Sequence, residues 1–146
     1  MDDQESTAAI AAALDGWSAL LGRQFGPLSR PQRRMLTLLA EHAETRIGDL
    51  TTRLGQTTAG TTRMIDALEG LGYARRLRLP DTDGRQVHVA LTEAGAAALR
   101  EADRVFLERV AATLAPLRPM ERAALARLLR AVAAIPPAAH ASAGEE

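Results

Sequence analysis

The chain contains no cysteine, no lysine and few aromatic side chains. Without a thiol, none of its 146 residues can form a disulfide or sense an oxidant through cysteine chemistry. Aromatic residues make up 3% of the chain, and much of its 47% hydrophobic content is alanine. Because alanine-rich helices bury modest apolar area alone, this composition favours a core that a partner chain completes.

Segments that would direct the chain to a membrane are also missing. No apolar run reaches the length of a membrane-spanning helix, and the N-terminus is acidic, unlike that of a signal peptide. We therefore expect a cytoplasmic protein. Its length fits a single small domain or one protomer of an intertwined dimer.

Sequence signatures of enzymes are absent as well. The chain has no G-x-S-x-G, no G-x-x-x-x-G-K-[ST] and no G-x-G-x-x-G motif. Its histidines, His42, His88 and His140, do not have the spacing of metal ligands. Asp81 and Asp83 could be paired carboxylates for acid–base chemistry, but turn formation explains both. The prediction is a protein without enzymatic activity, cofactor or metal.

The positive charge is unevenly distributed, although the net charge is zero. A zero total alone would suit a neutral soluble protein with no preference for nucleic acid. All 18 basic residues, however, are arginines, and acidic residues are spread through the flanks. One central segment holds Arg53, Arg63, Arg75, Arg76, Arg78 and Arg85. This segment is therefore predicted to face a polyanion.

A helix is expected to begin that segment, with Thr57 or Thr58 as its N-cap. Its buried face consists of Met64, Ile65, Leu68 and Leu71. Gly70 and Gly72 end the helix, because glycine adopts the left-handed conformation of a C-cap without strain. The residues before it, 47–54, are predicted to be a shorter helix that completes a helix-turn-helix.

The exposed face of the Thr58 helix has the composition of a DNA-reading surface. It carries Thr58, Ala59, Thr62 and Arg63 near the helix N-terminus. Small side chains let the backbone approach DNA closely, while hydroxyl and guanidinium groups bind base edges or phosphates. Arg53, at the end of the preceding helix, is a phosphate contact or a solvated arginine.

Beyond this helix the hydrophobic period changes to two. Residues 73–79 and 86–91 are predicted to be antiparallel strands around a turn at 80–85. Arg85 stands at the exit of the turn, where it can reach a narrow minor groove. The order helix, helix, strand, turn, strand predicts a winged helix-turn-helix.

Ionic contacts are expected to hold the wing against the helix. We predict that Asp66 pairs with Arg76 and locks helix to strand. Arg75 and Arg78 on the same strand then stay available to DNA.

At this point the sequence resembles the MarR family of winged helix-turn-helix transcriptional regulators. TTAGTTRMIDALEGLGYARR is similar to the family's recognition helix and strand entry, and DxDGRxxxVxLTEAG to its wing and following helix. By this resemblance, Arg85 is the wing-tip arginine and Asp83 its partner. The chain departs from the family at Thr61, a core-facing position that is usually aliphatic, and in a slightly long wing.

The resemblance also implies a homodimer built by the terminal helices and an effector pocket between them and the DNA-reading domain. The implied effector is a small aromatic or phenolic anion. Candidate lining residues are Trp17, Phe25, Met35, His42 and Arg46. For Trp17, packing in the core or in the dimer interface is the alternative.

The predicted fold is mainly α (α+β), a winged helix-turn-helix with a two-stranded wing flanked by dimerisation helices. The segments are 1–27, an N-terminal dimerisation helix; 28–92, the DNA-binding domain; 93–135, C-terminal dimerisation helices; and 136–146, a disordered tail. Outside the predicted helix-turn-helix and wing, helices are expected at about 6–24, 29–42, 92–114 and 120–134. Residues 1–5 are expected to be frayed.

Together these features predict a sequence-specific double-stranded DNA-binding transcriptional regulator, a ligand-responsive repressor that binds a pseudopalindromic operator as a homodimer. The predicted DNA contacts are Arg53, Thr57, Thr58, Ala59, Thr62, Arg63, Arg75, Arg78 and Arg85, and wing support comes from Asp66, Arg76 and Asp83. The alternative is a winged-helix protein-interaction module without specific DNA binding. A steep loss of DNA affinity with salt separates the two, because counterion release marks phosphate contact.

Overall fold

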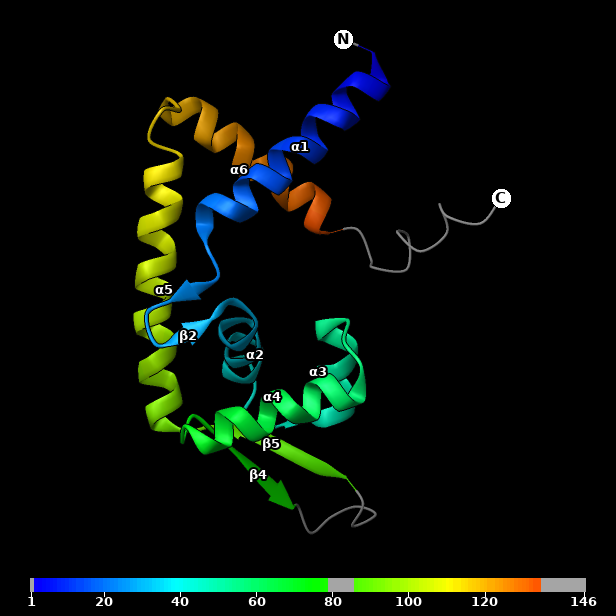
Figure 1. The fold of residues 1–146 in the computed structure, drawn as a ribbon, viewed down its shortest axis with the longest axis vertical. Helices are drawn as coiled ribbons and strands as arrows, with labels where there is room; N and C mark the ends of the chain where they lie inside the picture. Colours follow the sequence, from blue (N-terminus) through cyan, green and yellow to red (C-terminus); the bar gives the residue numbers. More distant parts are fainter. Residues whose placement is uncertain (1, 79–85, 135–146) are drawn as a thin grey trace, which may run out of the picture. The chain divides into compact units, whose positions relative to one another are not determined.

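The structure is a computed structural model that describes residues 2–78 and 86–134 (Figure 1). Its elements are α1 (Asp3–Leu21), β1 (Gln24–Phe25), β2 (Leu28–Ser29), α2 (Arg30–Ala40), β3 (Thr45–Arg46), α3 (Ile47–Leu54), α4 (Thr58–Gly70), β4 (Ala74–Arg78), β5 (Val87–Leu91), α5 (Glu93–Thr113) and α6 (Pro119–Ala133). The predicted class, mainly helical with a small antiparallel wing sheet, is confirmed.

Helix α1 begins at Asp3, before the predicted start at Ser6. Asp2 is its N-cap, and the Asp2 carboxylate accepts a hydrogen bond from Glu5 N at 2.7 Å. The Glu5 carboxylate in turn accepts one from Asp2 N at 3.2 Å. This reciprocal capping box satisfies two N–H groups that the helix leaves unpaired. The prediction of frayed residues is therefore wrong for the described residues 2–5.

A short hairpin follows α1, with two residues in each strand. The sequence predicted only that a helix ends there. Strands β1 and β2 pair antiparallel, with Phe25 opposite Leu28. Gly26 in the turn between them has a φ of +56°, which glycine adopts without strain. A capping box then opens α2 at the predicted start of a helix, because Ser29 N donates to Gln32 Oε1 at 2.9 Å and Gln32 N donates to Ser29 Oγ at 3.4 Å.

Helices α3 and α4 form the predicted helix-turn-helix. Gly55, with a φ of +61°, ends α3. Thr57, rather than Thr58, is the N-cap of α4, because Thr57 Oγ1 accepts a hydrogen bond from Gly60 N at 3.1 Å. Gly72, with a φ of +75°, lies between α4 and β4, as its place in the sequence predicted.

The wing strands belong to a three-stranded antiparallel sheet with the order β3-β5-β4. The sequence predicted β4 and β5 but not β3, which pairs Thr45 with Val89 and Arg46 with His88. A two-residue strand is too short to show a period of two, so only the tertiary pairing identifies it. The turn predicted at 80–85 lies outside the described residues.

The wing is fastened to α5 through Thr92. Thr92 Oγ1 donates to the carbonyl of Gly72 at 2.6 Å, and Gly95 N donates to Thr92 Oγ1 at 3.0 Å. Gly95 lies so close to β4 that a Cβ atom there would be 2.0 Å from the carbonyl oxygen of Tyr73. Only glycine fits this crossing.

The hydrophobic core forms where α2, α3, α4 and the sheet meet. Its largest apolar side chains with less than 2% exposure are Phe25, Leu28, Met35, Leu36, Leu39, Leu50, Ile65, Leu68 and Val89. The chain divides into two compact units at the junction of Arg109 and Val110, within α5, and this core belongs to the first. Helices α1 and α6 contribute no buried residue. None of the helices described is long and apolar enough to cross a membrane.

Candidate nucleic-acid interface

Helix α4 has one buried and one exposed face, as the sequence predicted, but the prediction is wrong for Leu71, which follows the end of the helix and is 52% exposed. Ile65 and Leu68 are fully buried against the core. Thr58, Ala59 and Arg63 are exposed and Thr62 is half-buried on the other face. The N-terminal half of α4 therefore presents small side chains, hydroxyls and a guanidinium to solvent, which suits a helix that enters a major groove.

Thr61 is accommodated in the core because its hydroxyl is paired inside the helix. The side chain is fully buried, and Thr61 Oγ1 donates to the carbonyl of Thr57 at 3.1 Å. A buried hydroxyl with a partner avoids the cost of an unpaired one. The departure from the family pattern thus leaves the buried face of α4 intact.

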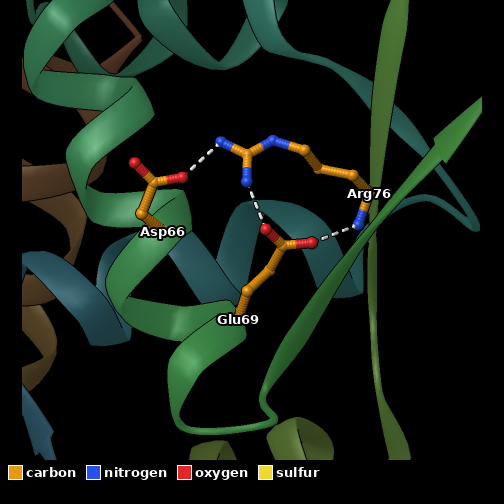
Figure 2. A network of polar contacts seen from close by, with 3 residues as sticks. All are labelled: Asp66, Glu69 and Arg76. Atoms are coloured by element: carbon orange, nitrogen blue, oxygen red, sulfur yellow. Dashed lines mark hydrogen bonds and ion pairs between the residues drawn. The ribbon is translucent and has the colours of Figure 1, made fainter.

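The predicted ion pair between helix and wing is present (Figure 2). Arg76 Nη2 lies 2.7 Å from Asp66 Oδ1. Glu69, which the sequence analysis missed, makes two further contacts: its carboxylate accepts a hydrogen bond from Arg76 N at 2.8 Å and pairs with Arg76 Nη1. The hydrogen bond that Arg76 donates to Asp66 and the charges of both carboxylates raise the pKa of Arg76 above its ordinary value. The side chain of Arg76 is thus held against α4.

Three other arginines near α4 have no ionic partner among residues 2–78 and 86–134. They are Arg63 on α4 and Arg75 and Arg78 on β4, and all three are exposed. Alternation along β4 places Arg78 on the same face as Arg76 and Arg75 on the opposite face. Among the described residues nothing occupies these three guanidinium groups, whereas Arg76 is paired with Asp66 and Glu69.

Arg53 is placed differently from these three. It forms an ion pair with Glu41, and the two side chains are 38% and 45% exposed. Exposed pairs of this kind contribute about 0–1 kcal/mol, so a DNA phosphate could replace Glu41 as the partner of Arg53. The sequence pattern gave no sign of Glu41, because the two residues belong to different helices of the fold.

A surface groove of about 520 Å³ lies between α3, α4 and the start of β5. It is lined by Arg46, Ile47, Gly48 and Asp49 at the start of α3, by Thr58 and Thr62 of α4, and by Gln86 and Val87 at the start of β5. We call it the α3–α4 groove. Unpaired N–H groups at a helix N-terminus favour an anion, which suits a groove beside a DNA backbone. Two predicted base contacts, Thr58 and Thr62, line it directly. Arg85 and Asp83, predicted for the wing tip, lie outside the described residues.

The structure does not bring the five predicted effector residues together. Phe25 lines one pocket, and His42 and Arg46 line another. Met35 is fully buried in the core. Trp17 on α1 is half-buried, and its Nε1 has no hydrogen-bond partner among the described residues.

The pocket at Phe25 has a volume of about 300 Å³ and is mostly apolar. We call it the aromatic pocket; its lining is Leu21, Phe25, Arg30, Arg33, Arg34, Thr37 and Phe106. The rings of Phe25 and Phe106 meet edge to face with centroids 5.2 Å apart. Arg33 lies 4.1 Å from the centroid of Phe106 and pairs with Asp103 at 2.6 Å. Arg34 is exposed and has no ionic partner in the described part of the chain. Arg33 and Arg34 were not predicted as pocket residues, because they follow the start of a helix and belong to no recognisable motif.

Comparison with known sequences agrees with this geometry. Residues 28–87 match the MarR family. The chain is 34% identical over 124 residues to the HTH-type transcriptional regulator Mb0904 of Mycobacterium bovis, a match that covers 81% of this chain and 86% of that protein. It is also 35% identical over 66 residues to the HTH-type transcriptional regulator YfiV of Bacillus subtilis, and this match spans 41% of that protein's length.

Solved structures of a MarR protein are also similar to this chain. Wild-type MarR from E. coli, in its apo form, superposes with a TM-score of 0.74 at 26% identity, covering 86% of this chain and 95% of that one. A mutant of E. coli MarR in complex with operator DNA gives a TM-score of 0.70 at 26% identity, covering 86% of this chain and 91% of the other. The chain therefore belongs to the MarR family of winged-helix, DNA-binding transcriptional regulators.

Proposed function

We propose that this MarR-family regulator is a homodimeric repressor that binds a pseudopalindromic operator and releases it when a small molecule binds. The observation that carries the proposal is the exposed N-terminal half of α4, with its small residues and Arg63, together with Arg75 and Arg78 on β4; none of these arginines has an ionic partner among the described residues. An apolar partner surface would leave these charges unmatched. A DNA backbone supplies phosphates that can pair with them.

The proposed contacts divide by role. Arg75, Arg78 and Arg53 bind phosphates and supply affinity that falls with salt. Thr57, Thr58, Ala59, Thr62 and Arg63 face the bases from α4. Arg85 enters the minor groove from the wing and responds to groove width; this last assignment depends on the sequence alone.

Two helices with no buried residue support a dimer. On α1, Ile10, Leu14 and Leu20 are 53–68% exposed. On α6, the exposed apolar side chains are Met120, Leu128, Leu129 and Val132. Surfaces of this kind typically form protein–protein contacts. A two-fold axis would present two copies of α4 about 34 Å apart, one turn of DNA, which gives the operator its symmetry.

The aromatic pocket is the proposed effector site. Its two phenyl rings suit a small aromatic or phenolic anion, and so does Arg34, which has no ionic partner among the described residues, since an apolar pocket with a few polar groups orients such a ligand. Phe25 is the residue of the predicted effector set that lines it. A ligand changes DNA affinity only if it binds one arrangement of the two DNA-binding domains of the dimer better than the other.

Selection of bound sequences from random duplex DNA is the experiment that tests the proposal. We expect enriched sequences with two inverted half-sites about 10 bp apart, measured centre to centre. Affinity for the selected site should fall steeply with salt, because each phosphate contact releases counterions. No enrichment, together with an affinity that is insensitive to salt, would instead support a protein-interaction module.

A further inference from the structure

The C-terminal end of α1 is held by arginines from two other helices. Its last turn contains no basic residue, and the last carbonyls of a helix have no partner within it. Arg30, the first residue of α2, donates through Nη2 to the carbonyls of Ser18 at 3.1 Å and Gly22 at 2.7 Å. Arg30 Nη1 donates to Ser18 Oγ at 3.1 Å. Arg30 therefore ties the end of α1 to the start of α2.

Arg109 on α5 holds the chain that leads out of α1. Its Nη1 donates to the carbonyls of Leu21 at 3.0 Å and Gln24 at 2.6 Å. Both arginines also lie over the ring of Phe25, with Cζ of Arg30 at 5.9 Å and Cζ of Arg109 at 5.2 Å from its centroid. The two arginines thus share one ring and the carbonyls around the end of α1. Of the two, only Arg30 lines the aromatic pocket.

The three arginines that line the aromatic pocket differ in what holds them. Arg33 is paired with the carboxylate of Asp103. Arg34 has no ionic partner among the described residues. The acceptors of Arg30 are neutral, two carbonyls and a hydroxyl, and residues 2–78 and 86–134 give it no carboxylate partner. Because a carboxylate carries a full charge and accepts two parallel hydrogen bonds from one guanidinium, an anion in the pocket is a stronger partner for Arg30 than these carbonyls.

We propose that Arg30 is a positioning residue that couples the aromatic pocket to α1. An anion bound in the pocket takes the guanidinium of Arg30 from the carbonyls of Ser18 and Gly22, and the last turn of α1 loosens. Arg109 keeps its own carbonyl partners, so α1 loses one of its two attachments. A neutral ligand of the same shape leaves Arg30 on α1.

This coupling rests on the proposed function, because it explains how a ligand of the aromatic pocket changes DNA affinity. The exposed apolar side chains of α1, among them Ile10, Leu14 and Leu20, belong to the proposed dimer contact. Loosening of α1 from α2 lets the helix-turn-helix move relative to that contact, so the affinities for ligand and operator are linked. Arg30 thereby makes the difference between a ligand that regulates and one that only occupies the pocket.

Hydrogen exchange of the full chain, measured by mass spectrometry without DNA, tests the proposal. The probe is benzoate at saturation, and benzamide, which has the same ring but no charge, is the matched control. We expect benzoate to speed the exchange of the backbone amides of residues 18–24 about tenfold, because the last turn of α1 loses its charged hydrogen bonds. Benzamide should leave this exchange unchanged.

The outcomes separate this coupling from the proposed effector site. Benzoate that binds, as measured by calorimetry, without speeding exchange at residues 18–24 overturns the coupling alone. An equal response to benzamide also overturns it, since no charge would be needed. Benzoate that does not bind overturns the coupling and the proposed effector site together. Since no DNA is present, a protein that fails to bind an operator counts against the proposed function only.

Substitution of Arg30 gives a second test. Arg30→Met keeps an apolar stem against Phe25 and loses every donor. Exchange at residues 18–24 should then be about tenfold faster without ligand, and benzoate should speed it no further. Arg100→Met on α5 is the matched control. In Arg34→Gln, a higher concentration of benzoate should still loosen α1.

A purely structural role for Arg30 would give a different pattern. Arg30→Met would then loosen α1, but the wild-type protein would not respond to benzoate, and this result overturns the proposal. The wild-type measurement needs no substitution, so it decides the question even if Arg30→Met does not fold.

Discussion

Glu69 holds β4 against α4 through more contacts than the predicted partner, Asp66. It accepts hydrogen bonds from both the backbone and the side chain of Arg76, and its side chain is 31% exposed against 60% for Asp66. The sequence suggested only Asp66, because charge complementarity alone does not show which carboxylate reaches the strand. At the scale of single residues, distance and burial decide the partner.

We expect Glu69→Ala to lower the free energy of unfolding by about 1–2 kcal/mol, because a partly buried, charged hydrogen bond is lost. Asp66→Ala should cost less than about 1 kcal/mol, as exposed pairs do. Urea denaturation of the two variants measures the difference. Equal effects would mean that Glu69 has no special part in the junction.

Gly95 is predicted to tolerate no side chain. A Cβ atom would lie 2.0 Å from the carbonyl oxygen of Tyr73 and 2.9 Å from Leu91 Cδ1. We expect Gly95→Ala to destabilise the fold by about 1–3 kcal/mol, the usual cost of overpacking. Gly48→Ala is the control, because no atom lies within 4 Å of its Cβ position and alanine favours a helix. A stable Gly95→Ala protein would contradict the close crossing of α5 and β4.

Arg34 is expected to supply the charge that attracts an effector to the aromatic pocket. Arg34→Gln should weaken binding of benzoate, a simple aromatic anion, by about tenfold, the effect of one charged hydrogen bond. Isothermal titration calorimetry on the protein without DNA measures this, with Arg100→Gln as the control. Benzoate that binds neither protein would leave the pocket without its proposed ligand class.

At the scale of elements, the helix-turn-helix and the two long wing strands follow from local pattern, and the short elements do not. Helix α4 has a recognisable N-cap, a buried stripe and a terminal glycine, so its position is predicted by the sequence. Strand β3 and the hairpin of β1 and β2 have two residues per strand and exist only through pairing. Asp2 is a capping residue that the sequence analysis overlooked, since the polar start resembled a frayed terminus.

The proposed DNA-reading role of α4 leads to a prediction for Arg63. We expect Arg63→Ala to weaken operator binding by about 1–3 kcal/mol, the scale of a base contact. A base-reading arginine would also relax preference at one position, whereas a phosphate contact would lower affinity uniformly. Fluorescence anisotropy with the selected operator and single-base variants distinguishes these outcomes; unchanged affinity would remove Arg63 from the interface.

The wing is tested by Arg85→Ala, expected to leave the protein folded and to reduce operator affinity by about 1–3 kcal/mol. The loss should be largest for operators with a narrow minor groove next to the half-site. The same anisotropy assay applies, with Arg100→Ala as the matched control. If the Arg85→Ala and Arg100→Ala proteins bind the operator with equal affinity, Arg85 makes no contact that contributes to operator binding.

At the scale of the whole molecule, oligomeric state is the central question. Leu14 is 53% exposed on a helix with no buried residue, which suits a contact between protomers. We expect Leu14→Glu to convert the protein from dimer to monomer and to weaken operator binding, because a charge would be buried without a partner. Light scattering after size-exclusion chromatography measures the mass, with Arg100→Glu as the control. A monomeric wild-type protein would refute the dimer itself.

The sequence by itself determined the winged helix-turn-helix, because period, caps and glycine turns are local properties that each segment carries alone. It also indicated the segment in which arginines are concentrated. The tertiary structure decided which arginines are paired: Glu69 and Asp66 hold Arg76, Glu41 holds Arg53, and Arg63 has no ionic partner in the part of the chain that the structure describes. It also separated Phe25 from His42 and Arg46 into two pockets. Such partnerships join residues that are distant along the chain, so no local pattern contains them.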